Sequence, residues 1–355
     1  MARPGKICRS IIFRVVFLSL TLVMHVSAWA NSDINHNDLS WLTDNTRFAL
    51  DVSTQAIHRS GDTTSRTAYN QQLGYDLHKV FSTFNKDLAT VVSQVYMSRI
   101  DNLNPHPPFY DDGDDWEMIY KINTINITAF NKGKLNLLLG HAELPYGLEY
   151  SIDTNNTLRT VPSAKNIGLK VDWGVGLNGY ANGIKYDVFL SRGSGVKYKT
   201  NESPYAISGR IGTAFGSQSQ LPSRGYGLSF FHGEILTSNN TSKRTRIGLD
   251  YQNIYGPFGA LVEFSLGLNE DKGAGDLFTE INWTSPNETF FSYLQLNSQH
   301  REGDSDWDNN LNISVGMDMF HYAGLSLGLK YSKDLSAINN SVKSNVFEFQ
   351  LRYRL

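Results

Sequence analysis

The most constraining feature of this sequence is the alternation of apolar and polar side chains over its last eleven residues. Phe347, Phe349, Leu351, Tyr353 and Leu355 alternate with polar or charged residues up to the end of the printed chain. Successive side chains of a β-strand point to opposite faces, so this segment forms a strand with one apolar and one polar face. Such a strand suits a wall between lipid and water. The pattern predicts the closing strand of an outer-membrane β-barrel.

The first thirty residues have the pattern of a secretory leader. Basic residues precede an apolar stretch at 15–26, and Ala28-Trp29-Ala30 follows as a small-x-small cleavage site. The apolar stretch is shorter than the ~20 residues that a spanning helix needs. We therefore expect residues 1–30 to be a cleaved signal peptide and the mature chain to begin at Asn31. The single cysteine, Cys8, lies in this leader, so disulfide scaffolds, thiolate metal sites and cysteine nucleophiles are excluded from the mature chain.

Composition excludes nucleic acid as a partner. The chain has 32 Lys and Arg residues against 34 Asp and Glu residues, and the leader contains four of the cations. The mature chain is thus mildly acidic, which disfavours nucleic-acid binding. No linker or composition shift divides it, so we predict a short periplasmic segment at 31–45 and one domain at 46–355.

Period-two alternation recurs along the chain, for example at 167–177, at 258–268 with Leu261 as the one exception, at 311–319 and at 325–331. These runs are not amphipathic helices, because period two spreads apolar residues around a helix of period 3.6. We predict sixteen strands, near 46–57, 67–78, 87–100, 115–128, 134–143, 166–178, 183–192, 204–215, 224–237, 243–255, 257–269, 276–284, 288–300, 309–320, 323–333 and 344–355.

A soluble β-sandwich also alternates, and three features favour the membrane. The strands are about ten residues long, as a tilted bilayer-crossing strand requires. Their polar positions carry Gly, Ser, Asn, Asp, Lys and Arg, as in a wet lumen. Aromatic residues such as Tyr180, Tyr255 and Phe258 flank the short turns, as in an interfacial girdle. These features predict an all-β transmembrane antiparallel barrel with short periplasmic turns and long extracellular loops, in the bacterial outer membrane.

The longest connection, at 142–166, gives the chain a resemblance to a known family. With its predicted strand count and this loop between the fifth and sixth strands, the chain resembles the sixteen-strand bacterial porins, whose loop at this position folds into the barrel. The segment Gly140–Glu149 looks like the strand-end motif of the phosphate-selective porin branch, a glycine followed by a proline-aromatic-glycine turn. The resemblance implies passive transport of small hydrophilic solutes or ions and a homotrimer. It does not imply phosphate, because the polar positions here carry mixed signs.

The candidate site residues are charged side chains of this loop and of the predicted inner wall. Opposed charges in a constriction create a field that selects solutes by charge and dipole. The constriction candidates are Glu143, Glu149, Asp153, Arg159 and Lys165, and the pore-lining candidates are Arg47, Asp51, Arg210, Arg246, Asp250, Lys330, Glu348 and Arg352. Each wall residue can also act only by solvating the barrel or by pairing across strands.

Other functions stay open as alternatives. An acidic cluster at 111–117 suits either a solvated loop or a divalent cation bridging lipopolysaccharide. The histidines lack metal-ligand spacing, so no metal or cofactor is expected. An adhesin or receptor barrel acting through its loops and a barrel hydrolase are the alternatives that stay open. We expect no enzyme activity, and as partners outer-membrane lipid, lipopolysaccharide and the barrel assembly machinery.

Overall fold

The structure is a computed structural model that describes residues 44–61, 65–83, 86–101, 116–128, 133–152, 154, 157–196, 203–213, 224–237, 240–303, 306–320, 324–336 and 343–355. The chain divides into two compact units, Met1–Thr46 and Arg47–Leu355. The predicted signal peptide, nearly all of the 31–45 segment and most of the 111–117 acidic cluster lie outside the described residues.

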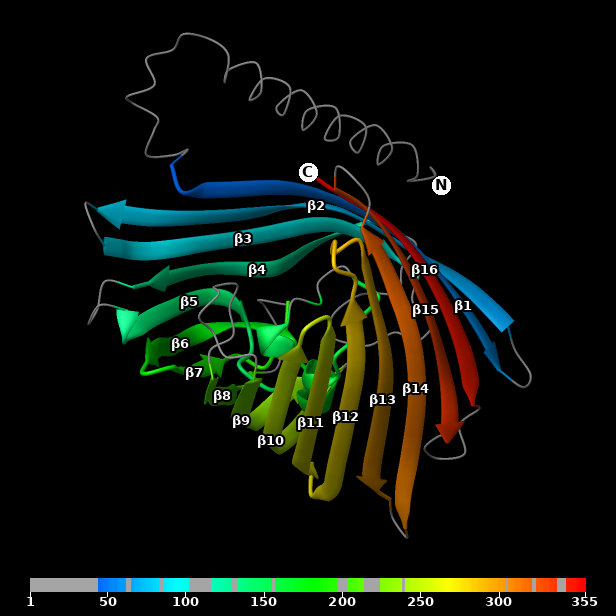
Figure 1. The fold of residues 1–355 in the computed structure, drawn as a ribbon. Helices are drawn as coiled ribbons and strands as arrows, with labels where there is room; N and C mark the ends of the chain where they lie inside the picture. The colour runs from blue at the N-terminus through cyan, green and yellow to red at the C-terminus, as the bar shows by residue number, and fades with distance from the viewer. Residues whose placement is uncertain are drawn as a thin grey trace, which may run out of the picture. The chain divides into compact units, whose positions relative to one another are not determined.

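The second unit is a closed antiparallel barrel in which each strand pairs with its neighbours in the sequence (Figure 1). Its closure confirms the predicted fold class and the predicted count of sixteen strands. The strands are β1 Thr46–Gly61, β2 Ser65–Thr83, β3 Lys86–Ile100, β4 Glu117–Ile127, β5 Asn136–Glu143, β6 Val171–Ala181, β7 Ile184–Ser191, β8 Ala206–Thr213, β9 Arg224–Leu236, β10 Thr241–Tyr255, β11 Phe258–Asn269, β12 Lys272–Thr284, β13 Phe290–Glu302, β14 Trp307–Phe320, β15 Leu325–Ser336 and β16 Ser344–Arg354.

The first and last strands close the barrel. Leu50 N donates to Leu355 O at 3.1 Å and Leu355 N donates to Leu50 O at 2.9 Å. The register between β1 and β16 places Ser53 opposite Arg352. On the inner face, the Arg352 guanidinium donates two hydrogen bonds to the Asp51 carboxylate, at 2.9 and 2.6 Å. Closure leaves no open strand edge, so every strand has two hydrogen-bonded neighbours.

Each strand separates an apolar outer face from a polar inner face. Along β10 and β11, Ile247 pairs with Leu266 and Leu249 pairs with Phe264, and all four side chains are exposed. The intervening positions are polar and buried, as Arg246 at 0% and Glu263 at 1% exposure show. This is the arrangement of a lipid-facing wall around a polar interior. No helix in the described part of the chain is long and apolar enough to cross a bilayer.

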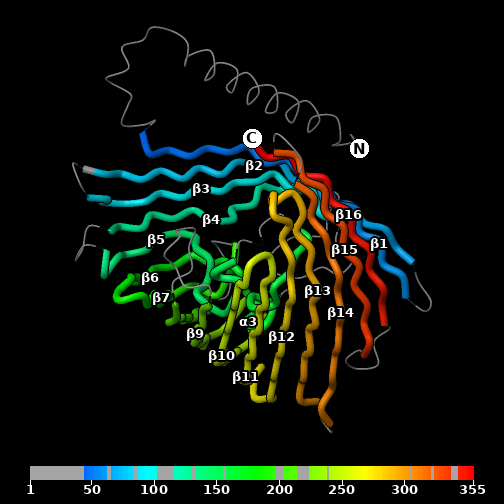
Figure 2. Tube along the Cα trace, in the orientation of Figure 1, coloured from blue at the N-terminus to red at the C-terminus, as the bar shows by residue number. Residues whose placement is uncertain are grey.

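The start of the sixth strand was predicted wrongly. Residues 166–170 do not extend β6, which begins at Val171; Ser163–Ile167 form a short helix, α3, that lies against β10 (Figure 2). Gly168 ends this helix with φ of 87°, a left-handed conformation that glycine adopts without steric cost. Ile167 and Leu169 continue the apolar alternation, but they are buried inside the barrel rather than on its outer face.

Candidate functional site

The connection between β5 and β6, residues 144–170, runs through the interior of the barrel. The Tyr150 hydroxyl donates to Asp187 of β7 at 2.7 Å, and Lys330 of β15 donates to the Thr160 hydroxyl at 3.1 Å. These strands lie far apart around the ring, and both residues belong to its inner face. A single segment that touches both must cross the lumen. We call residues 144–170 the inner loop.

Glu263 of β11 binds two parts of the inner loop, one at Leu148 and one at 163–166. Its carboxylate accepts a hydrogen bond from Leu148 N at 2.8 Å, another from the Ser163 hydroxyl, and a longer one from Asn166 Nδ2 at 3.4 Å. A side chain at Gly147 would collide with this carboxylate. Gly147 therefore permits the close approach, and its φ of 63° also favours glycine.

The inner loop also closes on itself through Glu149, in the 3-10 helix η3 (Glu149–Ser151). Glu149 N donates to the Ser163 hydroxyl at 3.1 Å, while the Glu149 carboxylate accepts from Ala164 N at 2.9 Å. The ammonium of Lys170 lies 3.1 Å from the same carboxylate. The first and last parts of the inner loop are thus joined through the Glu149 carboxylate.

The part of the inner loop around Arg159 is fixed by an ion pair with β12. Arg159 donates two hydrogen bonds to Glu280, at 3.0 and 2.6 Å, and its guanidinium lies 5.1 Å from the centre of the Phe291 ring. Gln295 of β13 donates to Glu280 at 2.8 Å and to Thr160 O at 3.0 Å. Planar bidentate pairs of this kind are geometrically specific.

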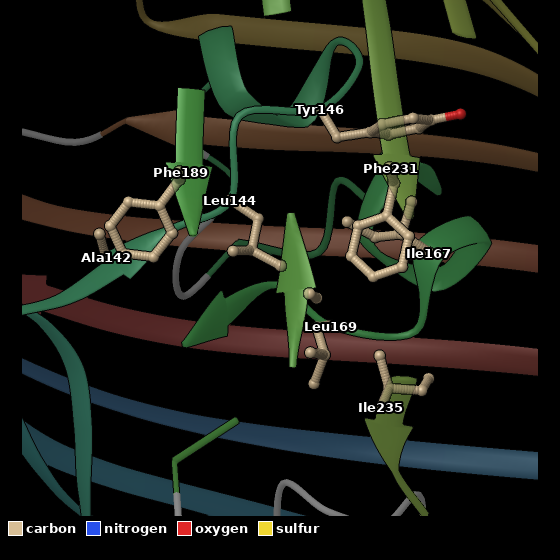
Figure 3. Packing of buried hydrophobic residues seen from close by; sticks show 9 residues of the cluster. Ala142, Leu144, Tyr146, Ile167, Leu169, Phe189, Phe231 and Ile235 are labelled. Carbon is tan, nitrogen blue, oxygen red and sulfur yellow. The ribbon is translucent and has the colours of Figure 1, made fainter. Parts of the chain in front are cut away.

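Apolar side chains fill the space between the inner loop and part of the wall. One cluster joins the loop to β7 and β9, with Leu144, Tyr146 and Ile167 packed beside Phe189 and Phe231 (Figure 3). A second cluster consists of Leu148, Val161, Leu261 and Phe278. Protein, rather than water, therefore occupies the lumen beside these strands.

Two cavities remain on the other side of the inner loop, and both are lined by Thr157. The first, of about 240 Å³, also reaches Val171 at the start of β6 and residues of β1, β2, β4 and β16. The second, of about 430 Å³, reaches the short-turn ends of β12 and β14 at Thr284 and Phe320. Thr157 thus borders both cavities. A third cavity of about 410 Å³ shares Arg159 and Phe291 with the second.

The constriction candidates occupy different environments. Glu143 ends β5, 3.7 Å from the Lys170 ammonium, whereas Glu149 and Arg159 are held as described above. Lys165 lies on α3 with an exposed side chain. Asp153 lies outside the described residues.

The pore-lining candidates separate into paired and buried groups. Arg210 and Asp250 form a buried pair, with side chains 3% and 2% exposed, and Arg246 is buried against Leu268 O and Asn269. These groups contact protein rather than open lumen. Asp51 with Arg352 and Lys330 with Glu348 form ion pairs on the inner wall, and Arg47 is exposed near the start of β1.

Sequence reasoning missed Thr157, Tyr150, Ser163, Glu280 and Gln295 as site residues. Glu280 belongs to a strand whose alternation is weak in the sequence, because Phe278 is an apolar residue at an inward position and Thr279 a polar residue at an outward one. The others are common polar residues. They are distinguished only by the partners that the fold brings to them. Several such pairs in the site join residues more than a hundred positions apart, as Arg159 and Glu280 are.

Catalytic and metal-binding arrangements are sparse in the described residues. These residues contain no group of three or more His, Cys, Asp or Glu side chains placed to hold a metal ion. Ser65 with His58 and Ser298 with His300 make serine–histidine contacts, at 3.4 and 3.1 Å. Among the described hydrogen bonds, neither imidazole has a carboxylate partner.

No family model and no curated protein sequence matches this chain. Solved structures do. The chain is similar to OprB of Pseudomonas putida at 10% identity and a TM-score of 0.65, covering 92% of this chain and 97% of that one. It is similar to an anion-selective porin from Comamonas acidovorans at 10% identity, TM-score 0.59, covering 87% and 99%. The trimer form of OmpT, an outer membrane protein of Vibrio cholerae, matches at 9% identity, TM-score 0.61, covering 87% and 99%.

The chain has the fold of outer-membrane porins. At these identities the likeness concerns the fold alone, and function depends on the site.

Proposed function

We propose that this chain is an outer-membrane porin, a passive diffusion channel for small hydrophilic solutes or ions. The observation that carries the proposal is that Thr157, on an internal loop that narrows a closed barrel, borders two separate cavities. A barrel of this size is too wide for its own side chains to fill. The inner loop fills one side of the lumen and leaves a polar route along the other.

The apolar outer face supports a location in the outer membrane. Strand-end aromatics such as Tyr180, Tyr255 and Phe258 are exposed on it, at 48%, 83% and 56%, as an interfacial girdle requires. We also propose a homotrimer, because one of the similar structures is described as a trimer form. Chemical cross-linking of purified protein in detergent, followed by electrophoresis, tests this assembly.

The ion pairs along the lumen support a channel without strong ion selectivity. Arg159 with Glu280, Lys330 with Glu348 and Arg352 with Asp51 each place opposite charges within 3.2 Å. Paired charges exert a weak field on a passing ion compared with isolated ones. For this reason we do not propose phosphate as the solute, despite the local likeness of Gly140–Glu149 to the phosphate-selective branch.

Among the constriction candidates, we propose Glu143 and Lys165 as residues that act on permeating ions. The Lys165 side chain is exposed and the Glu143 side chain is 20% exposed. Lys165→Gln should shift the reversal potential in a salt gradient toward cation preference, and Glu143→Gln should shift it toward anions. Equal shifts in one direction would contradict these roles.

Two alternatives predict different behaviour. An adhesin or receptor barrel acts through its outer loops and needs no open lumen. A barrel hydrolase needs an imidazole oriented by a third group, which the described serine–histidine contacts lack. We propose that the chain is not an enzyme, and assays with ester and phospholipid substrates test this.

Single-channel recording of the purified, refolded protein in a planar bilayer tests the channel. We expect discrete conductance steps that depend on the protein, with heat-denatured protein as the control. If correctly folded barrels insert without conducting, the channel proposal fails and the adhesin reading gains support.

A further inference from the structure

The cavity between Thr157 and strands β1, β2 and β4 is lined by neutral polar side chains, apolar side chains and two lysines. Neutral polar side chains from three strands face it, among them Ser53, Gln72 and Gln350, together with Thr154 and Thr157 of the inner loop. Ile119, Val171 and Val196 supply apolar patches. Amides and hydroxyls both donate and accept hydrogen bonds, so together they match a ligand that does the same.

Part of this hydrogen-bonding capacity is not used within the protein. Gln72 Oε1 accepts from Lys121 Nζ at 3.0 Å. Among the described residues, the Gln72 amide nitrogen, the Gln350 carboxamide and the Ser53 hydroxyl have no further hydrogen-bond partner. All three groups line the cavity, where a ligand can reach them.

The charges beside the cavity cancel. Lys121 and Lys170 line it, and Lys170 lies 3.1 Å from Glu149 and 3.7 Å from Glu143. Lys170 thus stands with two carboxylates, so the two ammonium groups are matched in number by two carboxylates, both beside Lys170. The next charged groups outward, Arg352 with Asp51 and Lys330 with Glu348, are also ion pairs. A charged ligand would lose hydration here without gaining a net opposite charge.

We propose that this cavity, bounded by Ser53, Gln72, Lys121 and Gln350, is a binding subsite for a small uncharged, hydroxyl-rich solute of monosaccharide size. Hydroxyl groups of the solute pair with the amides, and its C–H surface packs against Ile119, Val171 and Val196. The cavity volume of about 240 Å³ limits the ligand to a small molecule. This inference rests on the proposed channel function and specifies its solute class.

The test compares D-glucose, D-gluconate and protonated D-glucosamine, which differ in charge but little in size. Each is added to the full protein in a planar bilayer at constant salt and pH 6. We expect D-glucose to reduce the conductance along a saturable curve, with half-saturation at a lower concentration than for either charged analogue. A strictly linear fall with D-glucose, or stronger block by D-gluconate, would overturn the proposal.

Variants locate the site. The double variant Gln72→Leu with Gln350→Leu should raise the half-saturating D-glucose concentration about tenfold, because two hydrogen-bonding groups are lost. Gln252→Leu is the matched control, since Gln252 lines the third cavity, and it should leave block unchanged. If the double variant does not fold, Ser53→Ala should still raise the concentration about threefold. Unchanged block in the folded variants of this cavity would refute the location.

The outcomes separate this inference from the channel itself. Conductance without saturable block leaves the channel standing and refutes the subsite. If no conductance appears, the channel proposal fails, and calorimetric titration of D-glucose into the protein in detergent then decides the subsite. Saturable heat that the double variant loses would support it, and its absence would refute it.

Discussion

Asp250 and Glu263 lie directly opposite each other on the inner faces of β10 and β11, and both carboxylates are buried. Like charges in this position repel. Each carboxylate is compensated by a different part of the chain. Arg210 of β8 donates two hydrogen bonds to Asp250, at 3.0 and 2.6 Å, while the inner loop supplies the donors for Glu263. Docking of the inner loop therefore supplies the hydrogen-bond donors that compensate the buried Glu263 carboxylate of the wall.

Replacement of Glu263 should release the inner loop without unfolding the barrel. Glu263→Ala leaves Leu148 N and the Ser163 hydroxyl without their acceptor, and hydrogen bonds to charged groups contribute about 1.5 to 3 kcal/mol each. We expect hydrogen exchange of amides in 147–166 to accelerate at least about tenfold. Glu302→Ala, an exposed carboxylate at the end of β13, is the control. Unchanged exchange in Glu263→Ala would show that other contacts hold the loop.

Breaking the buried Arg210–Asp250 pair should destabilise the barrel. Asp250→Asn leaves a buried guanidinium uncompensated, at a cost of about 3 kcal/mol. Asp101→Asn breaks the Arg66–Asp101 pair, whose side chains are 59% and 33% exposed, and should cost less than about 1 kcal/mol. Urea unfolding in detergent micelles, followed by tryptophan fluorescence, measures both. Similar losses in the two variants would contradict the burial of the first pair.

The same substitution should cost more folding stability on the outer face of β16 than on its inner face. Phe349 is exposed on the apolar face, whereas its neighbour Gln350 faces the cavity. Phe349→Lys should cost about 2 to 4 kcal/mol near the bilayer midplane. Gln350→Lys places the same charge beside the cavity, where polar side chains surround it, and should cost less than Phe349→Lys. Refolding yield into lipid vesicles, read from heat-modified gel mobility, distinguishes them, and equal yields would mean that the faces are misassigned.

Enlarging Thr157 should narrow the channel. Because this residue lines both cavities, Thr157→Trp places an indole at the border of both. We expect single-channel conductance to fall roughly twofold or more, since conduction depends on the narrowest cross-section. Thr54→Trp, on the exposed face of β1, makes the same substitution outside the lumen and should conduct like the parent protein. A normal conductance in Thr157→Trp would place the route elsewhere.

Much of the fold follows from local sequence, because period two is a property of the extended backbone itself. Phe347, Phe349 and Leu351 identify the outer face of β16 before any partner strand is known, and similar alternations locate most of the strands. The same locality explains the error at Ile167 and Leu169. Their alternation continues that of β6. The chain instead forms a helix that ends at Gly168, and both side chains lie in the apolar cluster between the inner loop and the wall.

The site, in contrast, was decided by the tertiary structure. Ser163 and Glu263 are separated by 100 positions and Arg159 and Glu280 by 121, and no local pattern relates them. Their contact requires the barrel to close with a particular register and the loop to cross its lumen. The sequence by itself determined which residues form strands and which face lipid, because those follow from backbone geometry. Only the closed fold decided which polar groups are paired, which are buried and which line the cavities beside Thr157. Pairing and burial depend on distances between strands, and these are set by the whole barrel.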